Sequence, residues 1–317
     1  MNIQFGSKLT ALWAASSVIF MSLALSILTL PTSAHADGPA FEAYYKFFLG
    51  NKHSGFVIQR FEVHDTKKEM ISTYYCFVKT PSGSTTESLL AYSDLNFEPI
   101  SYQYTALADG KPKLVDAVFK NKKMTATIIE NGRSKKVTLA VKPNGFLSTF
   151  LNYVILKNGL STGKNYNFFA LSEEDPAFHE GTANIAAEQK VKNIDAFKID
   201  FNYKGVSFVG LVANNGEPLG TLSPEQNAST EMVATRAEAV GSLPFNEKQI
   251  STLFKGLPEG KNNKMNRATV VAEPGRSTVA TPTQMITTDS AKPANAGQMP
   301  TMISPPMTPP KTKPKGQ

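Results

Sequence analysis

The stretch Phe197-Lys-Ile-Asp-Phe-Asn-Tyr203 decides the fold class, because apolar and polar residues alternate along it without a break. Successive side chains of a β-strand point to opposite faces of the sheet, so its Phe, Ile, Phe and Tyr share one face and its Lys, Asp and Asn share the other. The same alternation recurs in Lys123–Glu130 and Lys136–Val141. This pattern is typical of an antiparallel sheet with one dry face and one solvated face.

Turn signals separate the apolar runs at short intervals. Asp109-Gly110 and Asn131-Gly132 supply the positive φ angles that two-residue hairpin turns need. Connections this short favour antiparallel neighbours in a long meander. The strands expected from these signals are 41–49, 54–64, 70–79, 84–93, 99–107, 113–120, 123–130, 134–141, 165–171, 181–191, 196–203, 206–213 and 230–236.

One segment breaks the alternation. Between Pro143 and Gly159 the apolar residues follow helical spacing and form a single stripe at positions 146, 147, 150, 151, 154 and 155. Asn144 is expected to cap the start of this helix, and Gly159 to end it in a left-handed conformation. We therefore predict a helix at about 145–158, and a second, weaker helix near 246–254.

These elements predict one mainly-β domain over residues 37–260. We expect a curved antiparallel meander, either a half-barrel or a barrel-like pair of sheets, wrapped around the amphipathic helix at 145–158. The reason is that the helix must bury its apolar stripe, and the concave face of a curved sheet provides the place. The chain has a single cysteine, Cys76, so the hydrophobic core must stabilise the domain without an intramolecular disulfide.

Residues 1–36 have the features of an export signal. One positive charge precedes an apolar run from Ala11 to Leu30, and Ala34 and Ala36 form an A-x-A cleavage pattern. We expect cleavage before Asp37 and a periplasmic or secreted location; the alternative is an uncleaved membrane anchor. A lipoprotein is excluded, because lipid attachment requires a cysteine at the cleavage point.

The net charge of +7 belongs to the end of the chain. Residues 37–260 have 24 basic and 24 acidic residues, whereas 261–317 have eight basic and two acidic residues. The basic character therefore does not indicate a nucleic-acid-binding body. We predict that the Pro-, Thr- and Lys-rich segment 261–317 is disordered. It either tethers the protein to an anionic envelope polymer or acts only as a solubilising tail, and its removal should leave the melting temperature of the body nearly unchanged.

Two arrangements could carry chemistry. The segment Ser172–Gly181 places three carboxylates before His179 and one after it, which could ligate a divalent cation, but the ligand order matches no known loop. Cys76, His179 and Asp175 could form a nucleophilic triad, but Cys76 lies within a predicted strand, where nothing nearby lowers its pKa. The body contains no P-loop, GxGxxG, HExxH, GxSxG or CxxC motif. We therefore expect no enzymatic activity, no cofactor and no metal site.

Aromatic residues crowd the first strands and occupy both faces of 41–49 and 70–79. They could line a cavity for an acyl chain or another apolar ligand, or they could simply fill the core around the helix. The residues that we expect to line such a groove or to fill the core are Phe47, Phe61, Phe146, Phe150 and Phe201.

Three phrases, together with the long meander and its inserted helix, carry a resemblance to a known group. They are Phe48-Leu-Gly-Asn-Lys-His-Ser-Gly-Phe56, Asp94-Leu-Asn-Phe-Glu-Pro99 and Asn214-Asn-Gly-Glu-Pro-Leu219. Residues 41–240 are similar to the LolA/LolB-like half β-barrel superfamily of exported lipid and lipoprotein handlers. The resemblance implies a curved sheet around a helix, with an apolar groove for a lipid or lipoprotein acyl chain. No motif aligns the ligand residues of the true carriers.

These observations lead to two functional hypotheses. The first is an exported, non-catalytic binding protein whose apolar groove takes a lipid, an acyl chain or a lipoprotein-like ligand. The alternative is a structural or interaction protein of the cell envelope with a filled barrel, which binds through its basic, Pro-rich tail.

Overall fold

The computed structural model describes residues 38–266, and these contain fifteen strands that form one sheet. The strands are β1 (Gly38–Leu49), β2 (Lys52–His64), β3 (Glu69–Thr80), β4 (Gly83–Asp94), β5 (Pro99–Ala108), β6 (Lys111–Lys120), β7 (Lys123–Glu130), β8 (Arg133–Ala140), β9 (Phe146–Leu147), β10 (Asn165–Ser172), β11 (Ala177–Val191), β12 (Ile194–Tyr203), β13 (Val206–Ala213), β14 (Pro218–Ser223) and β15 (Ala228–Val233). The helices are the 3₁₀-helix η1 (Ser148–Phe150), α1 (Leu151–Asn158), α2 (Arg236–Val240) and α3 (Glu247–Phe254).

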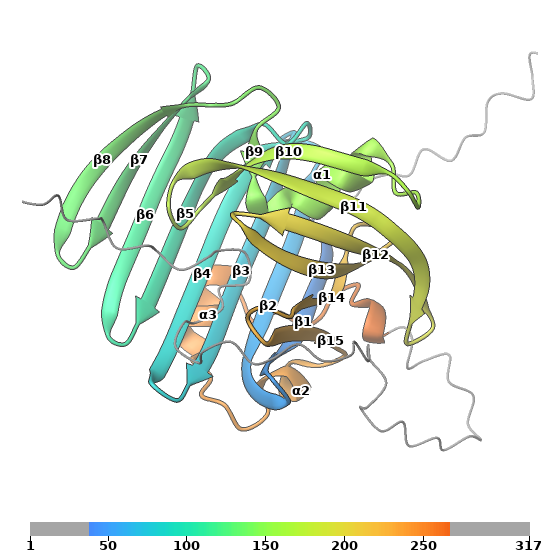
Figure 1. Cartoon of the computed structure of the whole chain (residues 1–317). Helices are drawn as coiled ribbons and strands as arrows, with labels where there is room; N and C mark the ends of the chain where they lie inside the picture. The colour runs from blue at the N-terminus through green and yellow to red at the C-terminus, as the bar shows by residue number, and fades with distance from the viewer. Residues whose placement is uncertain (1–37, 267–317) are drawn as a thin grey trace, which may run out of the picture. The chain divides into compact units, whose positions relative to one another are not determined.

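The sheet runs from β8 down to β1 and then from β15 down to β9. The join lies where β1 pairs antiparallel with β15, with Tyr44 opposite Val233 and Leu49 opposite Ala228. Neighbouring strands are antiparallel apart from the short parallel pair β9 and β10. The edge strands β8 and β9 do not pair with each other, so the curved sheet is not closed into a barrel (Figure 1). The predicted fold class is confirmed, as a single continuous sheet.

Two of the predicted hairpins show why the meander forms. Asp109 and Gly110 have φ angles of 50° and 77°, and Asn131 and Gly132 have φ angles of 51° and 73°. Two consecutive left-handed residues match the right-handed twist of the flanking strands, which is why Asn-Gly and Asp-Gly favour such turns. These turns join β5 to β6 and β7 to β8, so local sequence sets the register there.

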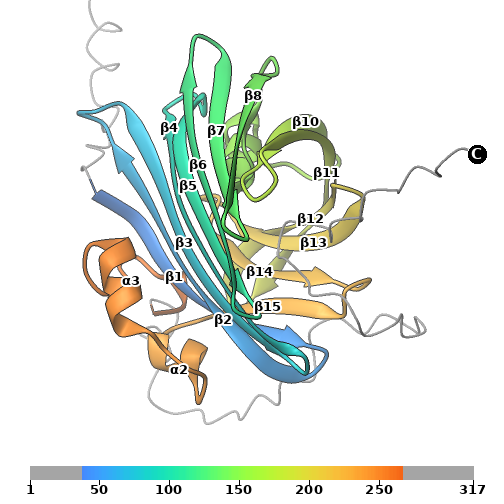
Figure 2. The ribbon, with the colours of Figure 1, turned by 90° about the vertical axis from the view of Figure 1, so that its left-hand side faces the viewer.

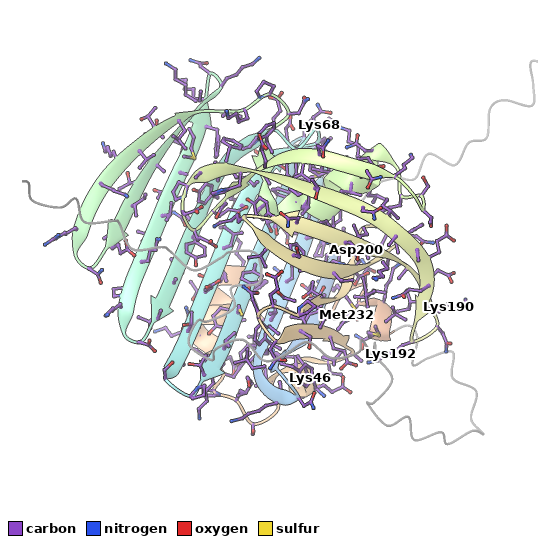
Figure 3. All side chains as sticks on the ribbon, viewed as in Figure 1. Lys46, Lys68, Lys190, Lys192, Asp200 and Met232 are labelled. Carbon is purple, nitrogen blue, oxygen red and sulfur yellow. The ribbon has the colours of Figure 1, made fainter. Side chains whose placement is uncertain are left out.

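The alternation along β12 also places its side chains as expected. Ile199, Phe201 and Tyr203 are buried, and Asp200 lies on the outer, solvated face. Lys190 and Lys192 lie near the turn between β11 and β12, where they pair with Asp195 and Glu231 at 3.0 and 2.5 Å (Figure 3). The outer face of this part of the sheet is therefore polar.

The chain from β13 to α2 differs from the prediction. Strand β14 was not predicted, because Pro218 and Gly220 interrupt its apolar pattern. The last strand ends at Val233, not at residue 236. The cause is Thr235, whose hydroxyl accepts a hydrogen bond from the backbone N–H of Glu238 in a capping box that begins α2.

The helix predicted at 145–158 is shorter at its start. Phe146 and Leu147 form β9, η1 follows, and α1 begins at Leu151. Asn144 does not cap it; this residue has a φ of 56° and lies in the preceding turn. Gly159 ends α1 with a positive φ of 98°, but its ψ of 116° differs from the left-handed helical conformation that was predicted.

Helix α1 packs inside the curve of the sheet. The Tyr153 ring stacks on Phe61 of β2, with centroids 3.8 Å apart and planes 7° apart, and also lies against Phe41 of β1. Tyr153 and Ile155 are both buried. The predicted relation between sheet and helix therefore holds.

A second apolar layer covers the convex face of β1–β3. Tyr44, Phe56, Tyr75 and Phe77 point outward from these strands and form a separate cluster with Phe254 and other residues of α2 and α3. Figure 2 shows α2 and α3 on the side of β1 and β2 opposite to β10–β15. Both faces of β1 and β3 are therefore buried, which explains why both carry aromatic residues.

The folded body extends past the predicted boundary at residue 260. Asn263 and Met265 are buried, and Asn263 Nδ2 donates to the Val233 carbonyl at 3.0 Å. The Glu42 backbone N–H donates to the Lys261 carbonyl at 2.7 Å. Residues 261–266 thus belong to the domain, although their composition had assigned them to the tail. The remaining tail, 267–317, and the predicted export signal lie outside the described residues.

We expect a chain that ends at Gly260 to be less stable than one that ends at Asn266. The shorter chain loses the burial of Met265, worth about 1.5–3 kcal/mol, and the hydrogen bonds of Asn263 and Lys261, each worth about 1 kcal/mol. Urea denaturation of the two chains should show a difference of about 3.5–5 kcal/mol. Equal unfolding midpoints would show that residues 261–266 do not stabilise the domain and that its boundary lies at residue 260.

Candidate functional site

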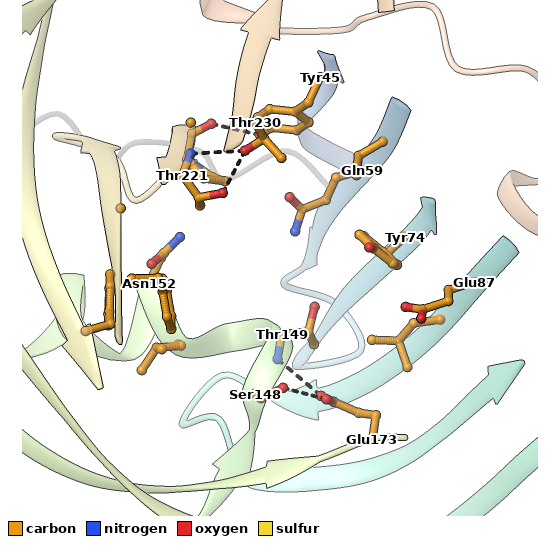
Figure 4. Close-up of a pocket in the computed structure, with 18 of the residues that line it drawn as sticks. Tyr45, Gln59, Tyr74, Glu87, Ser148, Thr149, Asn152, Glu173, Thr221 and Thr230 are labelled. Atoms are coloured by element: carbon orange, nitrogen blue, oxygen red, sulfur yellow. Dashed lines mark hydrogen bonds between the residues drawn. The ribbon is translucent and has the colours of Figure 1, made fainter. Parts of the chain in front are cut away.

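A cavity of about 150 Å³ lies between the concave face of the sheet and the start of α1 (Figure 4). Its apolar wall includes Val57, Leu89, Leu151 and Val212, together with the ring of Phe201. Polar side chains lie among these residues in the lining, including Gln59, Glu87, Thr149, Asn152, Glu173 and Glu174. The cavity is thus amphipathic, whereas the sequence predicted an apolar groove.

The structure places one of the five predicted aromatic residues, Phe201, in the cavity wall. Phe47, Phe61, Phe146 and Phe150 are buried in the hydrophobic core around α1. Phe201 stacks on Phe208 of β13, with ring centroids 4.9 Å apart. Of the five residues, Phe201 therefore lines the cavity, and the other four fill the core.

The acidic segment after β10 contributes two carboxylates to the cavity. Glu173 is buried and accepts hydrogen bonds from the Ser148 hydroxyl at 2.5 Å and the Thr149 backbone N–H at 3.1 Å. Burial raises its pKa to about 7, and these two hydrogen bonds oppose the rise. This carboxylate also ties the loop to the start of η1.

Glu174 has a cationic partner. Lys204 Nζ, which is almost fully buried, lies 2.5 Å from Glu174 Oε1 and 2.9 Å from Asp175 Oδ2, and it donates to the Ser172 hydroxyl at 3.0 Å. Desolvation raises the pKa of Glu174, and the charge of Lys204 opposes that rise. The negative charge of Glu174 is therefore largely offset within the protein.

Glu87 is the functional candidate that the sequence reasoning missed. It lies on β4, two residues before the buried Leu89, so its side chain points to the concave face. Burial raises its pKa to about 7 and nearby Glu174 adds to the rise, while a hydrogen bond from the Tyr104 hydroxyl and the charge of Lys113 oppose it. An acidic residue in phase with Leu89 and Ala91 is a signal that could have identified it.

The raised pKa values predict that stability falls as pH rises. Glu87 titrates near 7 in the folded protein against an ordinary value of 4.5. Below about pH 4.5 both states hold the proton and the stabilisation is complete. Between about pH 4.5 and 7 the unfolded state loses the proton more readily than the folded state, so unfolding becomes easier, and above about pH 7 the loss is complete. Glu87→Gln should remove on the order of 1–3 kcal/mol of this loss. Urea midpoints at about pH 5 and about pH 8 measure this loss of stability. The exposed change Glu180→Gln is the control and should behave like the wild type.

The triad considered from the sequence is not assembled as a nucleophilic site. His179 Nε2 does lie 3.2 Å from Asp175 Oδ2. Cys76, however, is buried on β3 beside Tyr74 and Glu87, and burial followed by the charge of Glu87 raises the pKa of its thiol far above the ordinary value. A thiol that keeps its proton is a poor nucleophile.

Two further searches concern the described part of the chain. Within residues 38–266, no three His, Cys, Asp or Glu side chains are grouped so that they could hold a metal ion. Over the same residues, no helix is long and apolar enough to cross a membrane.

Comparisons with known proteins concern the fold alone. No protein-family model and no curated protein matches the chain. The fold is similar to that of a β-barrel-like protein of the domain of unknown function DUF1849 from Brucella abortus, with 12% identity and a TM-score of 0.45 over 61% of this chain and 94% of that one. It is also similar to a DUF1089 family protein from Pseudomonas aeruginosa, with 11% identity and a TM-score of 0.33 over 53% and 89%.

Proposed function

We propose that this protein is a non-catalytic binding protein that takes a small amphipathic ligand into the cavity inside its curved sheet. The observation that carries the proposal is a hollow of about 150 Å³ lined by aliphatic and aromatic side chains, with carboxylates and amides among them. A cavity of that volume holds an apolar body of about the size of benzene.

The apolar wall supports a ligand with a hydrophobic body. Phe201, Leu89 and Val212 line it. A Cβ atom at Gly210 would lie 2.8 Å from the Phe201 ring, so the glycine leaves room for that ring beside the cavity. Transfer of apolar ligand surface out of water would supply the main part of the affinity, about 25 cal/mol per Å².

The sequence adds the compartment and the ligand family to the proposal. The export signal expected at 1–36 and the resemblance to LolA/LolB-like half-barrels favour a cell-envelope protein that handles lipid-like molecules. Sites for drug-sized ligands measure about 300–1,000 Å³. The smaller volume here favours a short amphipathic molecule, or one end of a longer one, over a complete acyl chain.

Binding of benzyl alcohol, a neutral probe of suitable size, tests the proposal. We expect chemical-shift changes in ¹⁵N-labelled full chain that cluster at cavity residues and saturate with probe concentration. Val212→Phe, which fills the cavity, should weaken binding at least about tenfold, a change of 1.4 kcal/mol. Val118→Phe makes the same change at an exposed position on β6 and should leave binding unaltered.

If neither benzyl alcohol nor a charged analogue binds, and Val212→Phe raises the stability, the interior is a packing defect. The alternative of an interaction protein with a filled barrel would then be favoured. Circular dichroism of both variants establishes that they keep the β-sheet fold.

A further inference from the structure

The charges that line the cavity do not balance. Three carboxylates, from Glu87, Glu173 and Glu174, contribute to its wall, and the lining contains no lysine, arginine or histidine. Lys204, which is not part of the lining, offsets the negative charge of Glu174. Neither Glu87 nor Glu173 forms an ion pair with a residue between 38 and 266. A buried carboxylate is stable only when it is paired, well hydrogen-bonded or protonated.

Two amide side chains give an independent indication of a polar ligand. Gln59 lies on β2 at an inward position between Val57 and Phe61, where a core residue would be expected. Asn152 lies across the cavity on α1 (Figure 4). Neither side-chain amide is hydrogen-bonded to another described residue. Half-buried amides without partners at such positions are costly unless a ligand or water pairs with them.

We propose that the polar head of the ligand is a protonated primary amine, received by the Glu87 carboxylate and by the side-chain oxygen of Gln59. This inference rests on the proposed function and names its ligand class. An ammonium group has three N–H donors and no acceptor, so a carboxylate and an amide oxygen replace part of its hydration in the cavity. A carboxylate ligand of the same shape would meet like charge.

The surroundings of Glu87 make its charge depend on the ligand. Tyr74 and Cys76 on β3, Tyr104 on β5, Lys113 on β6 and Glu174 all interact with it or face it. With a pKa of about 7, its carboxyl group is partly protonated at neutral pH. An ammonium ion favours the ionised form, so amine affinity should rise between about pH 6 and 8 and binding should release a proton.

A matched probe series tests the inference on the full chain. Benzylamine, benzyl alcohol and benzoate share one ring and differ in head-group charge. Isothermal titration calorimetry at about pH 8 should rank benzylamine at least about tenfold tighter than benzyl alcohol, with benzoate the weakest. Glu87→Gln should abolish the amine preference, so that benzylamine and benzyl alcohol bind with similar affinity, whereas Glu180→Gln, an exposed change on β11, should keep the preference.

The outcomes separate this inference from the proposed function. Equal affinity for amine and alcohol, tightest binding of benzoate, or an amine preference that survives Glu87→Gln would overturn the amine assignment and leave a neutral-ligand site standing. Failure of all three probes to bind would overturn the proposed function itself. If Glu87→Gln does not fold, Gln59→Leu provides the second variant, with the same expected loss of amine preference.

Discussion

Replacing Glu42 with alanine should lower the free energy of unfolding by about 3–5 kcal/mol. Glu42 is 1% exposed on the convex side of β1. Its carboxylate lies 2.6 Å from Arg60 Nη2 and accepts hydrogen bonds from the backbone N–H groups of Glu259, Gly260 and Lys261 at 2.8, 2.8 and 3.1 Å.

The expected loss is large because the variant leaves several groups without partners. Arg60 keeps its bond to the Phe254 carbonyl but loses the carboxylate, and three N–H groups lose their acceptor. Urea denaturation measures the loss. Glu62→Ala is the matched control, since Glu62 lies 3.7 Å from the same arginine but is 19% exposed, and should lose less than about 1 kcal/mol. Similar losses in both variants would show that Glu42 does not hold residues 259–261 to the sheet.

Phe150→Ala should lower the free energy of unfolding by about 3–5 kcal/mol. The Phe150 ring is fully buried, meets Phe61 edge-on with centroids 6.0 Å apart, and lies 6.1 Å from Phe97. Truncation removes these contacts and leaves a void between η1 and the sheet. The void cannot close without moving the helix.

The measurement is again urea denaturation, with Leu107→Ala as the control. Leu107 is 47% exposed, so its truncation should change stability by less than about 1 kcal/mol. A loss below about 1 kcal/mol for Phe150→Ala would place this ring in a compliant ligand groove and not in the core. Phe201, in contrast, lines the cavity, so its truncation should alter probe binding as well as stability.

Local sequence patterns predicted most of the architecture because strands and hairpins depend on neighbouring residues. Alternation in 197–203 identified β12, and Asn131-Gly132 identified the turn from β7 to β8. The second helix was predicted near 246–254, and α3 begins there because the Asn246 side chain accepts a hydrogen bond from the Gln249 N–H. Each of these signals acts over a few residues.

The candidate site could be predicted only in part. Phe201 was predicted to line a groove or fill the core, and it lies in the cavity wall. The acidic segment 172–181 was considered as a metal site, and it contributes Glu173 and Glu174 to the cavity. Glu87 and Gln59 were missed, because each is a single polar residue in a strand. Whether such a residue faces solvent or a cavity depends on what packs opposite it.

The sequence by itself determined the alternation in β7, β8 and β12, many of the turns and the end of the central helix. Tertiary structure decided the rest. Glu42 meets residues 259–261 across more than 200 positions of chain, which is why composition placed the boundary too early. The curve of the sheet brings Glu87 opposite Asn152, and α2 and α3 bury the outer aromatics of β1 and β3. Hydrophobic periodicity records which face of a strand is buried, but the partner that buries it is set by long-range packing.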